Sequence, residues 1–178
     1  MKKNIHILGA SGVGTSTLGA ALSKHLPHTH LDTDDYYWLD KFTKKREIPE
    51  RRKLLEKDLT INEKWILSGA VCGWGDNLKS YFDLVVFLWI PQDIRLERLR
   101  HREFQRYGNE VLAGGSKYEQ SKAFLEWASL YDTAGMEVRS RALHEHWMAD
   151  LSCPVLKIEG DCSVSERVHR VLDYLNSN

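Results

Sequence analysis

The sequence is poor in cysteine and in long apolar runs, and neither sign of charge is in excess. Its three cysteines show no paired spacing, which disfavours a metal cage and indicates a reducing compartment. Lysine plus arginine and aspartate plus glutamate number 25 each, so no bulk charge draws the chain to nucleic acid or to a membrane. No apolar run reaches the roughly 18 residues of a membrane-spanning helix, and Gly9 interrupts the N-terminal run too early for a signal peptide. We therefore expect a single cytoplasmic domain covering residues 1–178.

A glycine-rich segment near the N-terminus separates an apolar run of strand length from a pattern of helical spacing. Glycines let successive backbone N–H groups face an anion, and the N-terminus of the following helix adds positive potential. The spacing Gly9-x-x-x-x-Gly14, with Ser16 two residues later, fits the P-loop pattern G-x-x-x-x-G-K-[ST] except that Thr15 replaces the lysine. We predict that nucleotide phosphates bind to this loop, whose residues are Gly9, Ala10, Ser11, Gly12, Val13, Gly14, Thr15, Ser16 and Thr17.

Two other interpretations of this loop remain open. One is a structural turn without a ligand. The other is the dinucleotide-binding turn of an NAD(P)-dependent short-chain dehydrogenase, although Thr17 stands where that fingerprint has Gly or Ala. Tyr118-x-x-x-Lys122 resembles the catalytic pair of that family, but the same spacing recurs in Tyr37-x-x-x-Lys41.

Carboxylates gather after a second predicted strand, at residues 29–31. Asp32, Asp34 and Asp35 are costly to bring together without a cation or a polar ligand. Open α/β sheets bind ligands beyond the carboxyl ends of their strands, so we predict a binding role for this turn. N-capping of the next helix by Asp35 is the alternative.

The loop, one helix and then Asp32-Thr33-Asp34 together resemble the shikimate, gluconate and adenylate kinases, and most closely an adenylate kinase-like branch. The resemblance implies a three-layer α/β/α P-loop NTPase fold with a five-stranded parallel sheet in the order 2-3-1-4-5. It implies transfer of the γ-phosphoryl group of ATP, with Mg²⁺, to a small acceptor that the sequence does not identify. In this pattern Ser16 ligates Mg²⁺, Asp32 lies near its water shell and Asp34 faces the acceptor hydroxyl.

The same resemblance makes residues 33–62 an acceptor-binding insert, in which a helix is expected from Pro49 to about Asn62. Tyr37 is a candidate to stack on an acceptor ring, and Arg46 is a candidate to hold an acceptor phosphate. Ordinary packing and a solvated helix face explain these two side chains equally well.

A third predicted strand, residues 64–68, leads into a glycine-rich loop. Shikimate kinases carry an acceptor loop at this point, so Gly73 and Trp74 are further acceptor-site candidates. Asp76 is expected to cap a helix N-terminus.

A row of arginines follows the most apolar run of the chain, residues 83–90, which predicts a central parallel strand. Arg95 lies on the charged face of the next helix, where Arg98, Arg102 and Arg106 share one side at i, i+4 and i+8. In related kinases such arginines stand below a mobile lid, here residues 103–118, and clamp the phosphoryl group.

The resemblance thus implies Arg98, Arg102 and Arg139 as catalytic residues, with Arg139 following the lid. An arginine of the helix at 95–106, or Arg139 or Arg141, replaces the charge of the missing lysine if the chain is an active kinase. Otherwise the chain is a nucleotide-binding protein that has lost catalysis. A fifth strand at 153–158, an adenine-side turn at 159–161 and a closing helix at 164–175 complete the expected fold.

Overall fold

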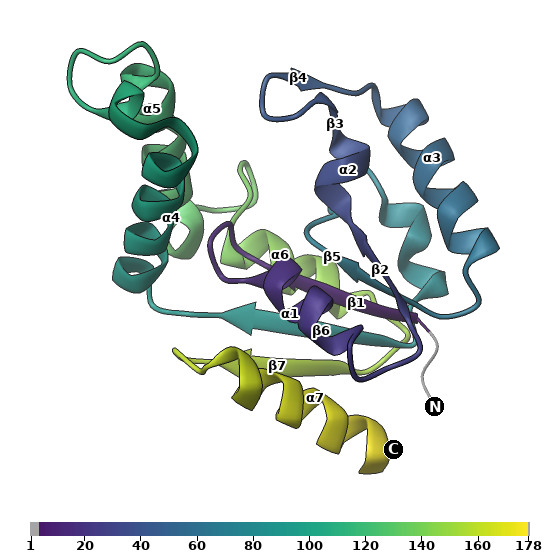
Figure 1. Cartoon of the computed structure of the whole chain (residues 1–178). Coiled ribbons are helices and arrows are strands. Elements are labelled where there is room, and N and C mark those ends of the chain that lie inside the picture. Colours follow the sequence, from purple (N-terminus) through teal and green to yellow (C-terminus); the bar gives the residue numbers. More distant parts are fainter. Residues whose placement is uncertain (1–3, 178) are drawn as a thin grey trace.

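A five-stranded parallel sheet forms the centre of the structure, a computed structural model that describes residues 4–177. Its strands lie in the order β2-β5-β1-β6-β7 (Figure 1). Their bounds are Asn4–Gly9 for β1, Thr29–Asp32 for β2, Trp65–Ser68 for β5, Leu84–Trp89 for β6 and Val155–Glu159 for β7. Counted along the chain, this is the predicted order 2-3-1-4-5, because β3 and β4 form a separate hairpin. The predicted three-layer α/β fold is confirmed.

The position of β5 decides between two α/β topologies. β5 pairs in parallel with β1 on one side and with β2 on the other, so β1 and β2 are not neighbours. In dinucleotide-binding sheets of the order 3-2-1-4-5, the first two strands are adjacent. The sheet topology therefore contradicts the dehydrogenase alternative.

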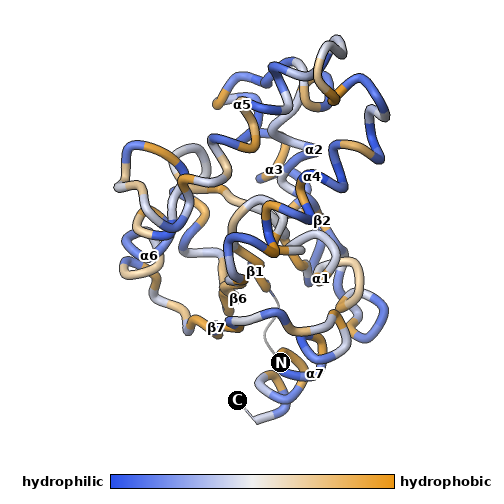
Figure 2. The backbone as a smooth tube through the Cα atoms, turned by 90° about the vertical axis from the view of Figure 1, so that its left-hand side faces the viewer, coloured by the Kyte–Doolittle hydropathy of each residue, from blue (hydrophilic) through white to orange (hydrophobic). Residues whose placement is uncertain are grey.

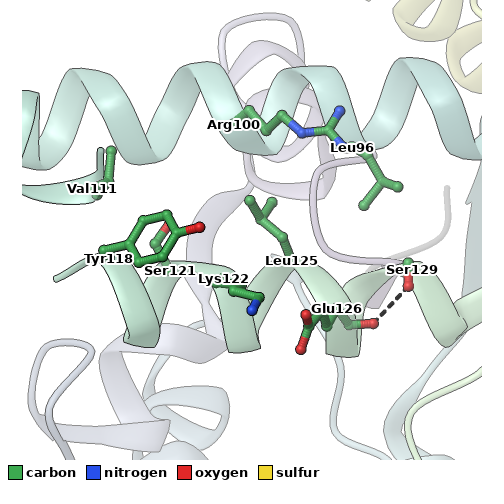
Figure 3. Close-up of a pocket in the computed structure, with 9 residues that line it drawn as sticks. All are labelled: Leu96, Arg100, Val111, Tyr118, Ser121, Lys122, Leu125, Glu126 and Ser129. Atoms are coloured by element: carbon green, nitrogen blue, oxygen red, sulfur yellow. Dashed lines mark hydrogen bonds between the residues drawn. The ribbon is translucent and has the colours of Figure 1, made fainter. Parts of the chain in front are cut away.

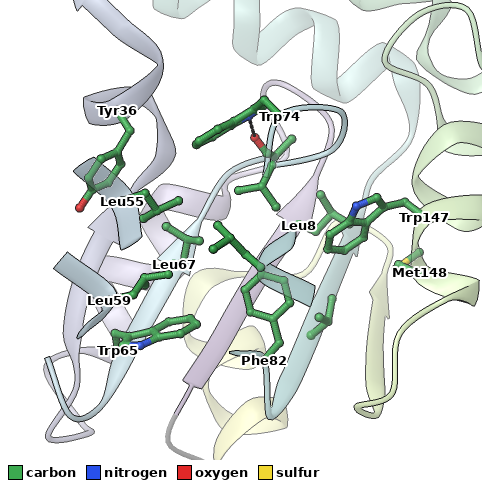
Figure 4. Packing of buried hydrophobic residues seen from close by; sticks show 14 of the residues in the cluster. Leu8, Tyr36, Leu55, Leu59, Trp65, Leu67, Trp74, Phe82, Trp147 and Met148 are labelled. Atoms are coloured by element: carbon green, nitrogen blue, oxygen red, sulfur yellow. Dashed lines mark hydrogen bonds between the residues drawn. The ribbon is translucent and has the colours of Figure 1, made fainter. Parts of the chain in front are cut away.

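Helices cover both faces of the sheet, and each face has its own apolar core. Helices α1 and α7 cover one face, while α3, α6 and the 3₁₀ helix η1 cover the other. The bounds are Thr15–Leu22 for α1, Ile48–Ile61 for α3, Asp76–Tyr81 for η1, Arg141–Ala149 for α6 and Val164–Ser177 for α7. Ile5 and Ile7 of β1 enter the first core and Leu8 enters the second, because side chains alternate along a strand. Figure 4 shows the second core, where Phe82 and Trp147 pack beside β1.

The insert between β2 and α3 contains structure that the sequence did not predict. It consists of the short helix α2 (Thr33–Tyr37) and a hairpin of β3 (Trp38–Asp40) and β4 (Lys44–Lys45). From the sequence, only the helix from Pro49 is expected within this insert. Phe42, in the connection between the two strands, has a φ of 66°, which a bulky side chain rarely adopts. Because this residue type does not indicate a turn, no local pattern predicted the hairpin.

Helices α4 (Gln92–Tyr107) and α5 (Tyr118–Ser129) form an arm that stands away from the sheet (Figure 1). The short 3₁₀ helices η2 (Gly108–Val111) and η3 (Leu130–Asp132) flank α5. In Figure 2 the strands β1 and β6 are largely hydrophobic, whereas α4 is mostly hydrophilic. Within residues 4–177 no helix is long and apolar enough to span a membrane.

One residue of α4 corrects the expected charged face. Arg95 is only 1% exposed, and it donates from Nη1 to the carbonyl of Ala128 at 2.8 Å and from Nη2 to Asp132 at 2.9 Å. The indole of Trp89 donates to the other oxygen of Asp132 at 2.7 Å. Arg95 therefore joins α4 to the end of α5 and, through Asp132, to Trp89 of β6, instead of facing solvent.

Candidate active site

The loop between β1 and α1 is shaped by glycine backbone. Gly12 and Gly14 have φ angles of 85° and 98°, which L side chains rarely adopt. A Cβ atom on Gly12 would also lie 2.8 Å from the side chain of Leu99 on α4. Since α1 begins at Thr15, the N–H groups of residues 15–17 have no acceptor within their own helix. This backbone fits the phosphate groups of a nucleotide.

The acidic turn is held by hydrogen bonds at the end of β2. Asp32 is the N-cap of α2 and accepts the N–H of Asp34 at 3.0 Å. The hydroxyl of Ser68 at the end of β5 donates to Asp32 at 3.3 Å and is bonded to His30 at 2.9 Å. The carboxylate of Asp35 instead pairs with Lys41 at 2.8 Å, so Asp32 and not Asp35 caps the helix.

Close backbone contact brings this turn against the neighbouring strand. Gly69, directly after β5, has a φ of 101°, and a Cβ there would lie 1.9 Å from the hydroxyl of Thr33. Only glycine allows the two segments to approach so closely. The carboxyl ends of β1, β2 and β5 meet at one edge of the sheet because these strands are parallel.

Asp34 faces two of the three predicted catalytic arginines. The charges of Arg139 and Arg102 and a hydrogen bond from the Trp38 side chain lower the pKa of its carboxyl group. Desolvation by burial, followed by repulsion from Asp32, raises that pKa more strongly, so the net shift is upward. The structure thus brings Asp34, Arg102 and Arg139 together. Sequence reasoning missed the bond from Trp38, which depends on the unexpected hairpin.

The arginine row of α4 does not act on one target. Arg98 pairs with Asp161, in the turn after β7, at 2.6 Å. The guanidinium carbon of Arg102 lies 5.8 Å from the ring centroid of Phe124 on α5, and its charge acts on Asp34. The guanidinium carbon of Arg106 lies 3.8 Å from the ring centroid of Phe42 in the hairpin. Periodicity predicted the shared helix side, but the partners on three other segments separate the three roles.

Two acceptor candidates in the insert have different surroundings. Arg46 donates to the carbonyls of Tyr36 at 3.1 Å and Trp38 at 3.3 Å, and it pairs with Glu50 at 2.7 Å. These contacts make Arg46 part of the framework of the insert. The half-buried ring of Tyr37 lies 3.9 Å from the guanidinium carbon of Arg51, which restrains its position.

The two acceptor-site candidates in the loop after β5, Gly73 and Trp74, have different surroundings. Trp74 is 3% exposed and donates from its indole to the carbonyl of Ala70 at 3.0 Å, so the ring belongs to the core (Figure 4). Gly73 is exposed, and a Cβ added there would meet nothing within 4 Å. Asp76 is the first residue of η1, and its carboxylate accepts the N–H of Gly73 at 3.1 Å and the Trp147 indole at 2.7 Å. It joins two segments and is not the expected N-cap.

Arg167 of α7 is a charged residue at the loop that sequence reasoning missed. It is 3% exposed, and its Nη1 donates to the carbonyl of Val13 at 2.7 Å. Burial lowers the pKa of this guanidinium, and the charge of Arg98 lowers it further. An available signal was its place on the apolar side of α7, four residues before Val171 and next to Val168.

The donors expected for Mg²⁺ are oxygen atoms, which this ion prefers. Ser16 is exposed in the first turn of α1, and Asp32 lies at the same edge of the sheet. No group of three His, Cys, Asp or Glu side chains suited to a metal occurs within the described residues. Mg²⁺ that accompanies a nucleotide keeps several waters and takes few protein ligands, so this donor set fits it.

The Tyr118 and Lys122 pair lies elsewhere. Both residues line a pocket of about 350 Å³ between α4 and α5, together with Leu96 and Leu125 (Figure 3). The pocket belongs to the arm and not to the glycine loop. The spacing that resembles a dehydrogenase pair therefore has no cofactor-binding turn beside it.

The sheet order, the glycine loop and the acidic turn together define a P-loop NTPase of the kinase-like group. Residues 5–119 match the family described as "AAA domain". The chain belongs to this family.

The chain is similar to one protein of known sequence over its full length and to two solved kinase structures. A Bacillus subtilis (strain 168) protein, "Uncharacterized protein YqaC", is 96% identical over 178 residues, which is the whole of both chains. Shikimate kinase from Acinetobacter baumannii in complex with shikimate has a TM-score of 0.61 at 18% identity, covering 99% of this chain and 94% of that one. Deoxyadenosine kinase from M. mycoides with bound dATP has a TM-score of 0.59 at 17% identity, covering 97% and 99%. At these identities the two kinase structures establish similarity of fold.

Proposed function

We propose that the protein transfers the γ-phosphoryl group of ATP to a hydroxyl group of a small acceptor. The observation that carries this proposal is that the positive charges of Arg139 and Arg102 act on the carboxylate of Asp34. The carboxylate follows a strand of the same sheet as the glycine loop and lies at the same edge. A base and two cations beside a phosphate-binding loop are what phosphoryl transfer requires.

Each group has a defined role in this reaction. Backbone amides of residues 10–16 hold the β-phosphate, and Ser16 and Asp32 hold Mg²⁺, which supplies charge neutralisation of the phosphates when bound. Asp34 orients the acceptor hydroxyl and accepts its proton at a carboxylate oxygen. Arg102 and Arg139 offset the negative charge that spreads over the transferred group. Arg98, which pairs with Asp161 in the turn after β7, is proposed to act on the nucleotide.

The acceptor is proposed to bind between the insert, residues 33–62, and the arm. The ring of Tyr37 and the open backbone at Gly73 provide contact surfaces for it. Residues 103–118 are proposed as the lid of a single domain. Gly108 and Gly114, with φ angles of 56° and 84°, flank the turn of this segment, and such residues absorb backbone rotation during closure.

The test is turnover of ATP with Mg²⁺ against a panel of hydroxylated acceptors: nucleosides, nucleoside monophosphates, sugars and cyclic polyols. We expect ADP production that depends on one acceptor class and is lost in Asp34→Asn while ATP still binds. Turnover that is equal in the wild type and in Asp34→Asn would contradict the proposal.

A second function is favoured by one residue, Thr15. A lysine at this position gives a charge-assisted hydrogen bond worth about 1.5–3 kcal/mol, which threonine does not provide. A protein that binds nucleotide without transferring phosphate is therefore the competing proposal. ATP binding without turnover across the whole panel is its expected signature.

A further inference from the structure

Thr15 leaves the loop without its usual cation, and Arg167 is a buried cation at the same loop. Its Nη1 donates to the Val13 carbonyl, and the same nitrogen would lie 3.3 Å from a Cβ on Gly14. Its Nε and Nη2 are buried without a hydrogen-bond partner within residues 4–177. No ion pair of the described residues includes this side chain. A buried charge without a partner is costly, so a purely structural role does not explain it.

The charges near Arg167 leave a positive excess. Arg98 faces it from α4, and Asp161 and Cys162 face it from the turn before α7. The carboxylate of Asp161 is already paired with Arg98 at 2.6 Å. Two guanidinium groups therefore lie near one carboxylate beside the glycine loop, and only Arg98 is paired with it. An anion in the loop is the group that would balance this excess.

The hydrogen bond to Val13 also fixes a peptide direction. In a trans peptide the C=O and N–H groups point in opposite directions. Because the Val13 carbonyl points to Arg167, the N–H of Gly14 in the same peptide unit points away from the guanidinium, toward the opposite side of the loop. A carbonyl that accepts from a cation also polarises its own peptide, which strengthens the N–H as a donor.

Hydrogen bonds at the start of α7 fix the helix turn that carries Arg167. The hydroxyl of Ser163 accepts the N–H of Glu166 at 3.2 Å, and the Glu166 carboxylate accepts the N–H of Ser163 at 2.7 Å. This reciprocal pair is a capping box, which fixes the first turn of a helix. Arg167 is the next residue.

We propose that Arg167 supplies, from behind the loop, the positive charge that the P-loop lacks at Thr15. It acts as a positioning residue: it holds the Val13–Gly14 peptide with its N–H toward the phosphates and adds a buried charge to their site. The ligand class is a di- or triphosphate chain. The inference rests on the proposed nucleotide site but not on the transfer of phosphate to an acceptor.

The test measures the affinity of the whole protein for tripolyphosphate, ATP and adenosine by calorimetry. We expect Arg167→Met to weaken tripolyphosphate and ATP about tenfold or more, and to leave adenosine binding unchanged. Arg167→Lys should keep most of the affinity. Thr15→Lys added to Arg167→Met should restore it, because the lysine returns the charge from the other side of the loop. Arg170→Gln, which removes an exposed charge from the same helix, is the control and should behave as the wild type.

Thermal unfolding separates this role from structural support. In Arg167→Met, a methionine of similar length replaces the unpaired buried charge. The melting temperature of this variant should therefore be equal to or above that of the wild type. An unstable Arg167→Met protein, equal loss of adenosine and tripolyphosphate binding, or unchanged tripolyphosphate affinity would each overturn the proposal. A wild type that binds tripolyphosphate but phosphorylates no acceptor refutes the proposed function alone. A wild type that binds neither ATP nor tripolyphosphate refutes both.

Discussion

The two halves of the candidate site differ in whether backbone or side-chain groups form them. The nucleotide half, which consists of residues 9–17 with α1 and α7, depends on backbone: two glycines at positive φ, a helix N-terminus and one buried arginine. The acceptor half, which consists of residues 33–62 with Arg102 and Arg106 of α4, depends on long side chains at or near the surface. A site made of backbone tolerates the loss of a single side chain such as the lysine, whereas a site made of side chains depends on each of them.

The largest effect is expected in the acceptor half, at Asp34. Asp34→Asn removes the proton acceptor and should lower turnover about a thousandfold, within the range typical of general bases. The affinity for ATP, measured by calorimetry, should stay that of the wild type because the nucleotide half is untouched. Asp35→Asn is the matched control, since that exposed carboxylate pairs with Lys41 and should change neither quantity. Loss of ATP binding in Asp34→Asn would show that the nucleotide half and the acceptor half do not act independently.

The next effect should separate two arginines of one helix. Arg102→Ala should lower turnover about a hundredfold with little change in the KM for ATP, because Arg102 faces Asp34. Arg98→Ala should instead raise the KM for ATP, since Arg98 pairs with Asp161 on the nucleotide side. Steady-state kinetics of both variants decide this. If both variants changed the turnover and the KM for ATP to the same extent, the arginines of α4 would act together on one phosphoryl group, as their spacing alone suggests.

This division explains what the sequence could reveal. The glycine loop lies within nine adjacent residues between a strand and a helix, so local spacing identified it. Helical periodicity placed Arg98, Arg102 and Arg106 on one side of α4, but their targets lie on three distant segments. Val13 and Arg167 are 154 residues apart, and no pattern within α7 points to the loop. Contacts of this kind are decided by the packing of the layers.

The hairpin shows the same limit for the fold. The strand β6 was found from the sequence because it is apolar throughout and buried on both faces. The short strands β3 and β4 contain exposed polar residues, and the positive φ of Phe42 is stabilised by contacts with Trp38 and Arg106. Asp34 receives its bond from Trp38 in this hairpin, so the acceptor half could not be completed without the tertiary structure.

A smaller effect should come from a methyl group on the loop backbone. Gly12→Ala places a Cβ at a φ of 85° and within 2.8 Å of Leu99, which strains the loop by about 1–3 kcal/mol. We expect tripolyphosphate affinity to fall about tenfold. Gly73→Ala is the control, because its φ of 79° is similar but its Cβ meets nothing within 4 Å. Equal phosphate affinity in the two variants would show that the cradle does not depend on the packing of Gly12.

The smallest expected effect is a loss of stability in acid, which should begin at the face of the sheet covered by α3 and α6. His6 and His144 lie on the face covered by α3 and α6, where His6 stacks on Phe82 at 4.7 Å and His144 is hydrogen-bonded to Tyr131 at 2.8 Å. Burial lowers the pKa of His6 from 6.5 to about 4 and that of His144 to about 3.

Because the folded pKa values lie below the unfolded value, the unfolded chain binds more protons as the pH falls below 6.5, and stability is lost in that direction. Each histidine should contribute about 1 kcal/mol of loss between pH 6.5 and 5.5, which is roughly fivefold in the unfolding constant. His6→Leu should flatten the pH dependence of thermal unfolding by this amount, whereas His169→Gln on the exposed side of α7 should leave the slope unchanged. Hydrogen exchange should show α6 losing protection at higher pH than α1. Simultaneous loss of protection in the two helices would show that acid weakens both faces of the sheet as one unit.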